Sequence, residues 1–344
     1  MVPWVRPVSD IILEKDEARI RYKGDSGSPV ISLRKIRQLD GHSKYCVERV
    51  GDGSIITLFD KTPYPVEAED VVCPHFLELK WANGCNYDCS WCYLNGTFRF
   101  RPMGKCPHMK DRDKVLEHVE SFVDYVRIPS IVNSGELSDS LVFEGNGFAI
   151  SDTILPLFKE QKRHKILLLT KSDQVGKVLH SDAEEQTIVS FTVNAFDVSK
   201  RWERRAPTPQ KRLNAAEKIV DGGFETRLRI DPIVPVDGWE KKYKQLIDYI
   251  FSKIVPERIT LGSLRGLNST IIHSKDKSWV GYLDDHSNWG KKVNFDKRKE
   301  IFETLIDYLR EEHSYTSIGL CKETKQMWAA LDMDYRKIRC NCVW

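Results

Sequence analysis

The sequence predicts an α/β fold: a partial (β/α)6 TIM-like barrel with a small β-rich N-terminal extension and a cysteine-containing C-terminal tail. From about residue 76, short runs of β-favouring residues alternate with amphipathic stretches of helical period, which is typical of βα units around parallel strands. The preceding residues instead show short alternating runs separated by Gly and Pro. We therefore expect an extension at 1–75, a barrel at 76–315 and a tail at 316–344.

Six strands are expected along the barrel segment, at 76–81, 130–134, 166–170, 188–193, 226–230 and 259–262. Helices are expected between and after them, at 111–126, 151–161, 209–221, 240–254 and 296–311. The helix at 209–221 has the clearest pattern, because its apolar residues recur on one face: Leu213, Ala216, Ile219 and Val220. Two glycines directly after it form a stop signal.

The bulk composition is that of a folded protein, with 41% apolar and 30% charged residues. No apolar run approaches the ~20 residues of a membrane-spanning helix, so we expect a cytoplasmic monomer with no cleaved signal and no membrane partner. The charges are nearly balanced, 53 Lys and Arg against 50 Asp and Glu. Any site for a polyanion must therefore be local.

The nine cysteines fit metal binding in a reducing compartment better than a disulfide framework. Cys85, Cys89 and Cys92 fall within eight residues, directly after the first expected strand, where the active-site loops of barrels emerge. Thiolates this close together favour an iron–sulfur cluster or zinc. A zinc knuckle would need a fourth ligand nearby, whereas the next cysteine is Cys106. Three ligands on a four-iron cluster would leave one iron open to a substrate.

The C-x3-C-x2-C spacing, with an aromatic residue after it, resembles the radical S-adenosylmethionine (SAM) superfamily. This resemblance implies a [4Fe–4S] cluster on Cys85, Cys89 and Cys92, whose open iron chelates the methionine part of SAM. An electron from the cluster would cleave SAM to a 5′-deoxyadenosyl radical that abstracts hydrogen from a substrate. A partner such as flavodoxin or ferredoxin would supply the electron.

Over roughly residues 76–250 the chain also resembles the spore photoproduct lyase family, radical enzymes that repair a cross-linked thymine pair in DNA. The similar segments are Cys92-Tyr93-Leu94, Leu169-Thr170-Lys171, Phe191-Thr192-Val193-Asn194, Arg212-Leu213, Pro232-Ile233 and Gly238-Trp239-Glu240. The resemblance implies that four residues line the SAM site: Tyr93, Lys171, Thr192 and Asn194. These positions lie near the C-terminal ends of expected strands. The alternatives are a solvated lysine and strand residues with ordinary hydrogen bonds.

The chain departs from that family at the segment 134–139. The repair lyases carry there a cysteine that returns a hydrogen atom to the product radical, and this position is occupied here by Glu136. A carboxylate cannot donate a hydrogen atom as a thiol does. Trp91 likewise replaces the family's tyrosine between the second and third cluster cysteines.

Gly135-Glu136 resembles instead the Gly-Gly-Glu stretch that binds the methionine ammonium in other superfamily members. This resemblance adds Gly135, Glu136 and Ser138 to the expected SAM site. Tyr93 and Glu136 are the catalytic candidates. The resemblance thus implies a relative of the repair lyases that lacks their hydrogen-donor cysteine.

Four further cysteines are candidates for a second metal centre. Cys321, Cys340 and Cys342 lie in the tail, and Cys73 precedes the first expected strand. Four thiolates would complete either a structural zinc site or a second iron–sulfur cluster, and chain spacing alone does not choose between them. Free surface or core thiols are the alternative.

Two segments interleave cations with aromatic residues, as nucleic-acid sites do. We expect substrate contacts from both of them: Arg99 and Arg101, then Lys200, Arg201, Trp202, Arg204 and Arg205. The expected substrate is a base of DNA or RNA, undergoing repair or modification. The alternatives are a solvated basic surface, a radical enzyme acting on a peptide or small metabolite, and a non-catalytic Fe–S or zinc binding protein.

Overall fold

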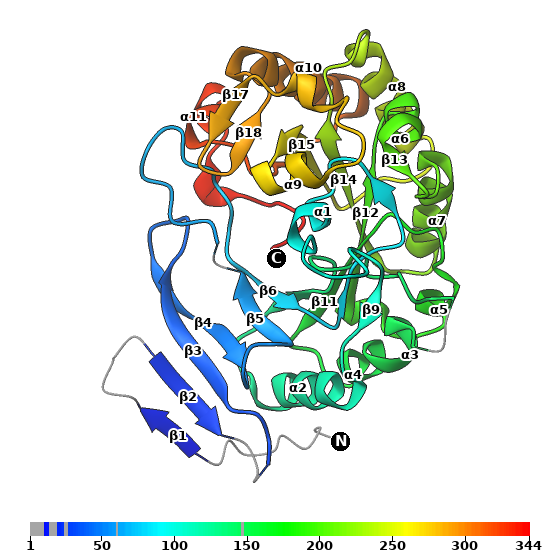
Figure 1. Ribbon diagram of the computed structural model, residues 1–344. Helices are drawn as coiled ribbons and strands as arrows, with labels where there is room; N and C mark the ends of the chain where they lie inside the picture. Colours follow the sequence, from blue (N-terminus) through cyan, green and yellow to red (C-terminus); the bar gives the residue numbers. More distant parts are fainter. Residues whose placement is uncertain (1–9, 14–18, 24–26, 60, 146–147) are drawn as a thin grey trace.

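The computed structural model describes residues 10–13, 19–23, 27–59, 61–145 and 148–344, the first two ranges by their backbone alone. In this part of the chain, one twelve-stranded sheet runs through the molecule in the order β1-β2-β3-β4-β5-β6-β10-β11-β12-β14-β15-β19. Its second half curves into an open ring of strands with helices outside, as Figure 1 shows. The predicted α/β fold with a partial barrel is confirmed.

The ring consists of parallel strands that follow one another in chain order. They are β6 (Phe76–Leu79), β10 (Ile131–Asn133), β11 (Lys165–Thr170), β12 (Thr187–Val193), β14 (Glu225–Ile233), β15 (Arg258–Ser263) and β19 (Ile318–Leu320). The first six correspond to the six predicted strands. The seventh, β19, was not predicted, because three residues are too short a run to stand out in a sequence.

The extension forms the other half of the same sheet. Its strands pair antiparallel, and β5 continues antiparallel onto β6. They are β1 (Asp10–Leu13), β2 (Arg19–Lys23), β3 (Ile31–Arg37), β4 (Ser43–Val50) and β5 (Ile56–Phe59). The β-rich extension therefore lengthens the barrel sheet (Figure 1, blue).

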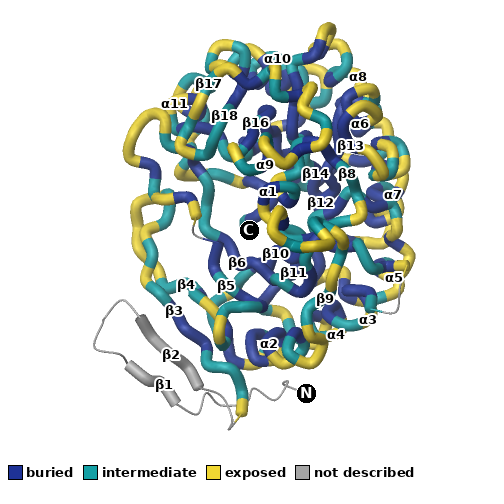
Figure 2. The backbone as a smooth tube through the Cα atoms, in the orientation of Figure 1, coloured by how far each residue is buried: buried dark blue, intermediate teal, exposed yellow. Residues whose placement is uncertain are grey.

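Helices pack on the outside of the ring, so that its strands are buried on both faces (Figure 2). The longer ones are α2 (Arg112–Tyr125), α7 (Pro209–Asp221), α8 (Trp239–Phe251) and α10 (Phe295–His313), close to four of the predicted helices. The shorter ones are α1 (Leu94–Thr97), α3 (Ile150–Thr153), α4 (Leu155–Lys159), α5 (Gly176–Leu179), α6 (Phe196–Trp202), α9 (Asn268–His273) and α11 (Lys325–Ala330).

Two expectations for the helices were wrong in detail. The helix expected at 151–161 is broken into α3 and α4 at Ile154, because Pro156 has no amide hydrogen to continue the helical ladder. On α7, Val220 does not share the buried face with Leu213 and Ile219 but is 36% exposed. The buried face of α7 instead includes the charged residue Arg212, which is paired with Glu203.

Short strands pair around the mouth of the ring. They are β7 (Ala82–Asn83) with β9 (His108–Met109), β8 (Asp88–Cys89) with β13 (Glu203–Arg204), and β18 (Gly290–Lys292) with both β16 (Arg265–Gly266) and β17 (Asp285–Ser287). These pairings hold the connecting segments over the C-terminal ends of the parallel strands.

The C-terminal segment, residues 338–344, enters the interior of the ring (Figure 1, red). Asn341 is fully buried there, and its side chain bonds three strands. Its amide nitrogen donates to Ser190 Oγ at 2.7 Å and to the Leu228 carbonyl at 3.0 Å, while its oxygen accepts from Thr260 Oγ1 at 2.6 Å. The segment therefore closes the ring on the side opposite its mouth.

Among the residues described, none of the helices has the length and apolar character that crossing a membrane requires.

His164, at the start of β11, should make stability fall in mild acid. The side chain is fully buried against Phe122, and burial lowers its pKa from 6.5 to about 4. The folded state thus favours the neutral ring, so its stabilisation is complete above pH 6.5 and is lost as the pH falls towards 4. We expect a loss of roughly 3 kcal/mol over that range, from 1.36 kcal/mol per pKa unit.

Urea unfolding at several pH values would measure this loss. The control is His164→Gln, which cannot titrate and should show a correspondingly shallower dependence on pH. An equal dependence in both proteins would assign the acid sensitivity to other groups, such as His118, whose pKa burial also lowers.

Candidate active site

A cavity of about 400 Å³ lies at the C-terminal ends of the parallel strands. Barrel enzymes place their chemistry at this end. Most of the predicted site residues line this one cavity: Cys73, Cys85, Cys89, Cys92, Tyr93, Gly135, Glu136, Ser138, Lys171, Thr192, Cys321, Cys340 and Cys342. The exception among the expected SAM contacts is Asn194. The fold therefore gathers side chains that are up to 269 positions apart, from Cys73 to Cys342, around one space.

The loop with the three clustered cysteines is fixed at several points. The amide of Cys85 donates to the Lys105 carbonyl at 2.8 Å, and Ser90 donates to the carbonyl of Trp202 at 2.8 Å. In the middle of the loop, Cys89 pairs with Glu203 across the β8–β13 ladder. These contacts hold the loop against neighbouring segments, and all three cysteines line the cavity.

Two glycines make the close approaches that this arrangement needs. Gly84 has φ +89°, and a Cβ there would lie 2.5 Å from the carbonyl oxygens of Lys105 and Cys106. At Gly135 a Cβ would lie 2.5 Å from the Cβ of Leu169. Both positions therefore exclude any larger residue, since backbone lies against the first and strand β11 against the second.

The donor set fits the cluster expected from the sequence. Burial raises the pKa of Cys85 and Cys89, so that both are thiols in the free protein. Metal binding would deprotonate them and release protons. Three soft ligands from one loop, beside an open cavity, fit a [4Fe–4S] cluster with one iron facing that cavity.

Lys171, predicted to contact SAM, directly follows strand β11 and is held by a buried carboxylate. Its Nζ lies 3.7 Å from Glu203 Oε1, and Arg212 Nη1 lies 2.7 Å from the other oxygen of Glu203. Burial by itself would lower the pKa of Lys171, but the negative charge of Glu203 raises it. Glu203 Oε1 is buried and has no hydrogen-bond partner among the described residues. The lysine therefore stays charged, facing the cavity.

Glu136 follows the neighbouring strand β10, and two neighbours fix it beside the cavity. Asn133 Nδ2 donates to its Oε1 at 3.0 Å, and the Tyr93 hydroxyl donates to its Oε2 at 3.5 Å. Beside it, Ser138 faces the cavity with a buried Oγ that lacks a hydrogen-bond partner among the described residues. A carboxylate and an unpaired hydroxyl in one wall fit a ligand that carries an ammonium group.

Asp139 links the segments that carry Glu136 and Lys171, although the sequence had not singled it out as a site residue. It accepts from Thr170 Oγ1 at 2.6 Å and from the backbone amide of Lys171 at 2.7 Å. The segment that carries Glu136 is thereby tied to the end of β11, which Lys171 directly follows.

Thr192 lines the cavity, but Asn194 lies beneath it. The Asn194 side chain is fully buried: it donates to the Pro232 carbonyl and accepts from the Tyr243 hydroxyl, both at 2.8 Å. With these partners it supports the wall of the cavity from behind.

Strand β14 contributes charged cavity residues that sequence reasoning missed. Asp231 forms a bidentate ion pair with Arg265, at 2.9 and 3.0 Å, and Arg229 faces the cavity two residues before it. The signal was present in the sequence, because charged residues alternate along this strand: Glu225, Arg227, Arg229 and Asp231. An alternation of this kind places the four side chains on one face of the strand.

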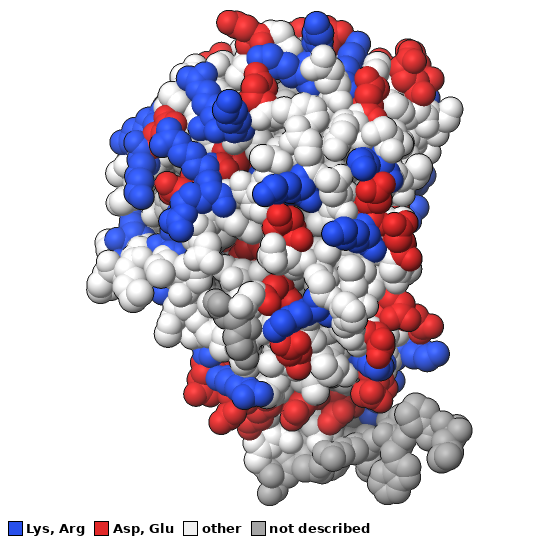
Figure 3. Space-filling view, turned by 90° about the vertical axis from the view of Figure 1, so that its right-hand side faces the viewer, with Lys and Arg blue, Asp and Glu red and all other residues white. Residues whose placement is uncertain are grey.

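The expected substrate residues divide into exposed and buried groups. Arg99, Lys200, Arg201, Arg204 and Arg205 are exposed, whereas Arg101 is half-buried. Figure 3 shows Lys and Arg side chains gathered in the upper left of the face that it displays.

Trp202 is a correction. It is fully buried, packs on Trp91 with ring centroids 5.8 Å apart, and donates to Ser278 Oγ at 2.8 Å. An indole in this position cannot stack on a base, and it supports the cluster loop from below.

A family model described as spore photoproduct lyase matches residues 31–263 of the chain. The spore photoproduct lyase of Clostridium acetobutylicum is 24% identical over 182 residues, which are 52% of this chain and 52% of that protein. The one of Bacillus subtilis is 25% identical over 173 residues, 49% of each. The chain therefore spans about half the length of these curated relatives.

Solved structures show the same fold. A spore photoproduct lyase mutant with bound AdoMet and dinucleoside spore photoproduct has a TM-score of 0.60 with this chain at 15% identity, covering 72% of this chain and 76% of that one. A spore photoproduct lyase complexed with dinucleoside spore photoproduct gives a TM-score of 0.60 at 15% identity and covers 71% and 75%.

Replacing Glu203 should destabilise the protein strongly. In Glu203→Gln the fully buried Arg212 loses its counter-charge, and breaking one side of a buried pair costs about 3 kcal/mol or more. Urea unfolding at pH 7 measures the loss. The matched control is Glu185→Gln, an exposed carboxylate 3.8 Å from Lys162, for which we expect a change within about 0.5 kcal/mol. Equal losses in the two variants would contradict this view of the network.

Proposed function

The chain belongs to the spore photoproduct lyase family, and on that premise we propose that it is a radical SAM enzyme with a [4Fe–4S] cluster on Cys85, Cys89 and Cys92. The observation that carries the proposal is the cavity itself. Three thiols of one loop, the charged Lys171 and the carboxylate of Glu136 surround the same space. A bound cluster supplies, when reduced, the electron that cleaves SAM to methionine and a 5′-deoxyadenosyl radical.

The residues of the cavity would bind and orient the cosubstrate. Glu136, with Ser138 and the Gly135 backbone beside it, would hold the ammonium group of SAM. Lys171, directly after β11, and Thr192 of β12 would make polar contacts, with Lys171 kept charged by Glu203. Tyr93 would orient Glu136 through its hydroxyl. Asn194 would act only by supporting the wall, because its side chain is already bonded to Pro232 and Tyr243.

The proposed substrate is a base in DNA or RNA, which the enzyme would repair or modify. Support comes from the solved relatives, whose ligand is a dinucleoside spore photoproduct, and from the exposed cations beside the cluster loop. Arg204 lies opposite Asp88 of that loop in the β8–β13 pair. Guanidinium groups at this rim would contact phosphates. A peptide or small metabolite is the second candidate, since the thiol that completes thymine repair in the family is replaced here by Glu136.

The cellular setting follows from the same chemistry. A small electron donor such as flavodoxin or ferredoxin would reduce the cluster. All nine cysteines are free in the structure, which fits a protein working in a reducing cytoplasm. We propose that it acts as a monomer. The four cavity thiols outside the cluster loop are candidates for a second metal centre.

Loss of a cluster ligand should abolish the reaction and the cluster together. In Cys89→Ala, two thiols remain in the loop, and we expect protein reconstituted without oxygen to lack the cluster and form no 5′-deoxyadenosine with SAM and a strong reductant.

In Lys171→Ala the iron content should stay at the wild-type level, while SAM binding weakens by about tenfold or more, because one charged contact is worth roughly 1.5–3 kcal/mol.

Iron analysis, 5′-deoxyadenosine chromatography and SAM titration give these results. The control is Cys106→Ser, an exposed cysteine that should change nothing. The central proposal fails if wild-type protein with a full cluster yields no 5′-deoxyadenosine.

Nucleic-acid binding should depend on salt and on the cations at the mouth of the cavity. For duplex DNA, removing one cation that neutralises a phosphate makes the slope of log affinity against log salt shallower by about 0.9. We expect such a change for Arg205→Ala. Lys162→Ala is the control, because Lys162 is also exposed but precedes β11, at the other end of the barrel. If the wild-type protein binds no oligonucleotide at low salt, the peptide or metabolite alternative takes precedence.

A further inference from the structure

Four cysteines outside the cluster loop meet in one part of the active-site cavity. They come from three segments: Cys73 before β6, Cys321 directly after β19, and Cys340 with Cys342 in the C-terminal segment. Backbone contacts fix these segments. Val72 donates to the Glu323 carbonyl and Cys321 to the Leu261 carbonyl, both at 2.8 Å. The meeting of the four sulfurs is therefore a property of the fold, since separate tertiary contacts produce it.

Two guanidinium groups are directed at these sulfurs. Arg229 Nη2 donates to Cys342 Sγ at 2.8 Å, and Arg265 Nη2 donates to Cys321 Sγ at 3.4 Å. Arg265 also has Asp231 as a counter-charge, but for Arg229 the structure gives the Cys342 sulfur as its hydrogen-bond partner, and its buried Nε has none among the described residues. Asp231 and Glu136 supply negative charge in the vicinity of Arg229, but the atom at hydrogen-bond distance is the Cys342 sulfur. A metal-bound thiolate there would be a stronger, charge-assisted acceptor than a neutral thiol.

A single ion and a four-iron cluster require different spacings of the four sulfurs. A tetrahedral zinc site holds every sulfur about 2.3 Å from one ion. In the described part of the chain, no three Cys, His, Asp or Glu side chains converge closely enough to hold one metal ion. This finding applies equally to the cluster loop, whose three cysteines line the same cavity. In a four-iron cluster each thiolate binds a different iron, so the sulfurs stand farther apart.

We propose that Cys73, Cys321, Cys340 and Cys342 bind a second [4Fe–4S] cluster, beside the same cavity as the one held by Cys85, Cys89 and Cys92. Four protein thiolates complete this cluster, so it has no open iron for SAM or substrate. Its chemistry is limited to the exchange of one electron. That electron-transfer role rests on the proposed radical function, whereas the binding of the cluster does not.

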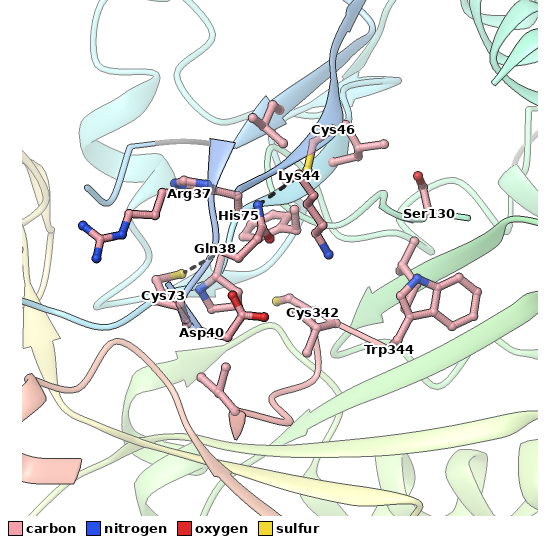
Figure 4. A pocket seen from close by; sticks show the side chains of 18 of the residues that line it. Arg37, Gln38, Asp40, Lys44, Cys46, Cys73, His75, Ser130, Cys342 and Trp344 are labelled. Carbon is pink, nitrogen blue, oxygen red and sulfur yellow. Dashed lines mark hydrogen bonds between the residues drawn. The ribbon is translucent and has the colours of Figure 1, made fainter. Parts of the chain in front are cut away.

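A second cavity gives this cluster a connection to the outside of the barrel. It has a volume of about 320 Å³ and lies between the β-rich extension and the C-terminal segment. Cys73 and Cys342 line both cavities, and Figure 4 shows both side chains among the residues around this second one. The residues shared by the two cavities would thus place the cluster between the active site and a cavity lined by Arg37, Lys44 and Arg336.

Metal analysis of the full chain, reconstituted without oxygen, tests the proposal. We expect about eight irons and eight sulfides per wild-type chain, the content of two four-iron clusters. The double variant Cys340→Ser/Cys342→Ser should retain about four irons and its SAM-dependent spectrum. The triple variant Cys85→Ala/Cys89→Ala/Cys92→Ala should also retain about four, with an electron paramagnetic resonance signal that SAM does not change. Cys106→Ser serves as the control and should keep all eight.

The outcomes separate the second cluster from the radical function. About four irons in the wild type and none in the triple variant would overturn the second cluster and leave the proposed function intact. About four irons with one zinc would also overturn it, in favour of a zinc site. A triple variant with four irons beside a wild type that forms no 5′-deoxyadenosine would support the second cluster and defeat the radical function. If the double variant does not fold by circular dichroism, Cys321→Ala replaces it with the same expected iron count.

Discussion

The site depends on how the polar interior of an incomplete barrel is filled. Strands β12, β14 and β15 present Ser190, Arg227 and Thr260 to the inside of the ring, where water would otherwise enter. The C-terminal segment occupies that space, and Asn341 satisfies the hydroxyls of Ser190 and Thr260 together with a strand carbonyl. Each such bond contributes about 1 kcal/mol net, but leaving the buried group unpaired would cost more. The floor of the cavity is therefore made by a segment that belongs to no barrel strand.

Buried charge is the second constraint, and the structure meets it with pairs that extend towards the cavity. Glu203 neutralises Arg212 on one side and approaches Lys171 on the other, while Arg227 donates to the carbonyls of Asn341 and Val343 at 2.9 and 2.6 Å. Such pairs cost desolvation energy and give little net stability compared with apolar packing. Their value lies in orientation, because a lysine bound to a fixed carboxylate keeps both its charge and its direction.

The parts of the fold and site that follow from local sequence were predictable. The cluster loop is one contiguous motif, and α7 carries its apolar stripe, its Thr208 cap and its glycine stop within a short window. The features that depend on partners far away in the sequence were not predictable. Trp202 reads as an exposed stacking residue beside cations, but Trp91 and Ser278 bury it. Arg229 was overlooked, because its partner Cys342 lies 113 positions along the chain. Short strands such as β19 take their pairing from a neighbour and carry no pattern of their own.

The seating of residues 338–344 inside the ring has a consequence for the order in which the protein is made. During synthesis the parallel strands leave the ribosome before this segment, so the barrel must wait with its interior open and its inward hydroxyls and arginines in water. Only when Cys340 and Cys342 arrive do the walls around the cavity become complete. In that half-assembled barrel, the cavity cysteines that precede the segment, such as Cys73 and Cys321, would still be open to solvent.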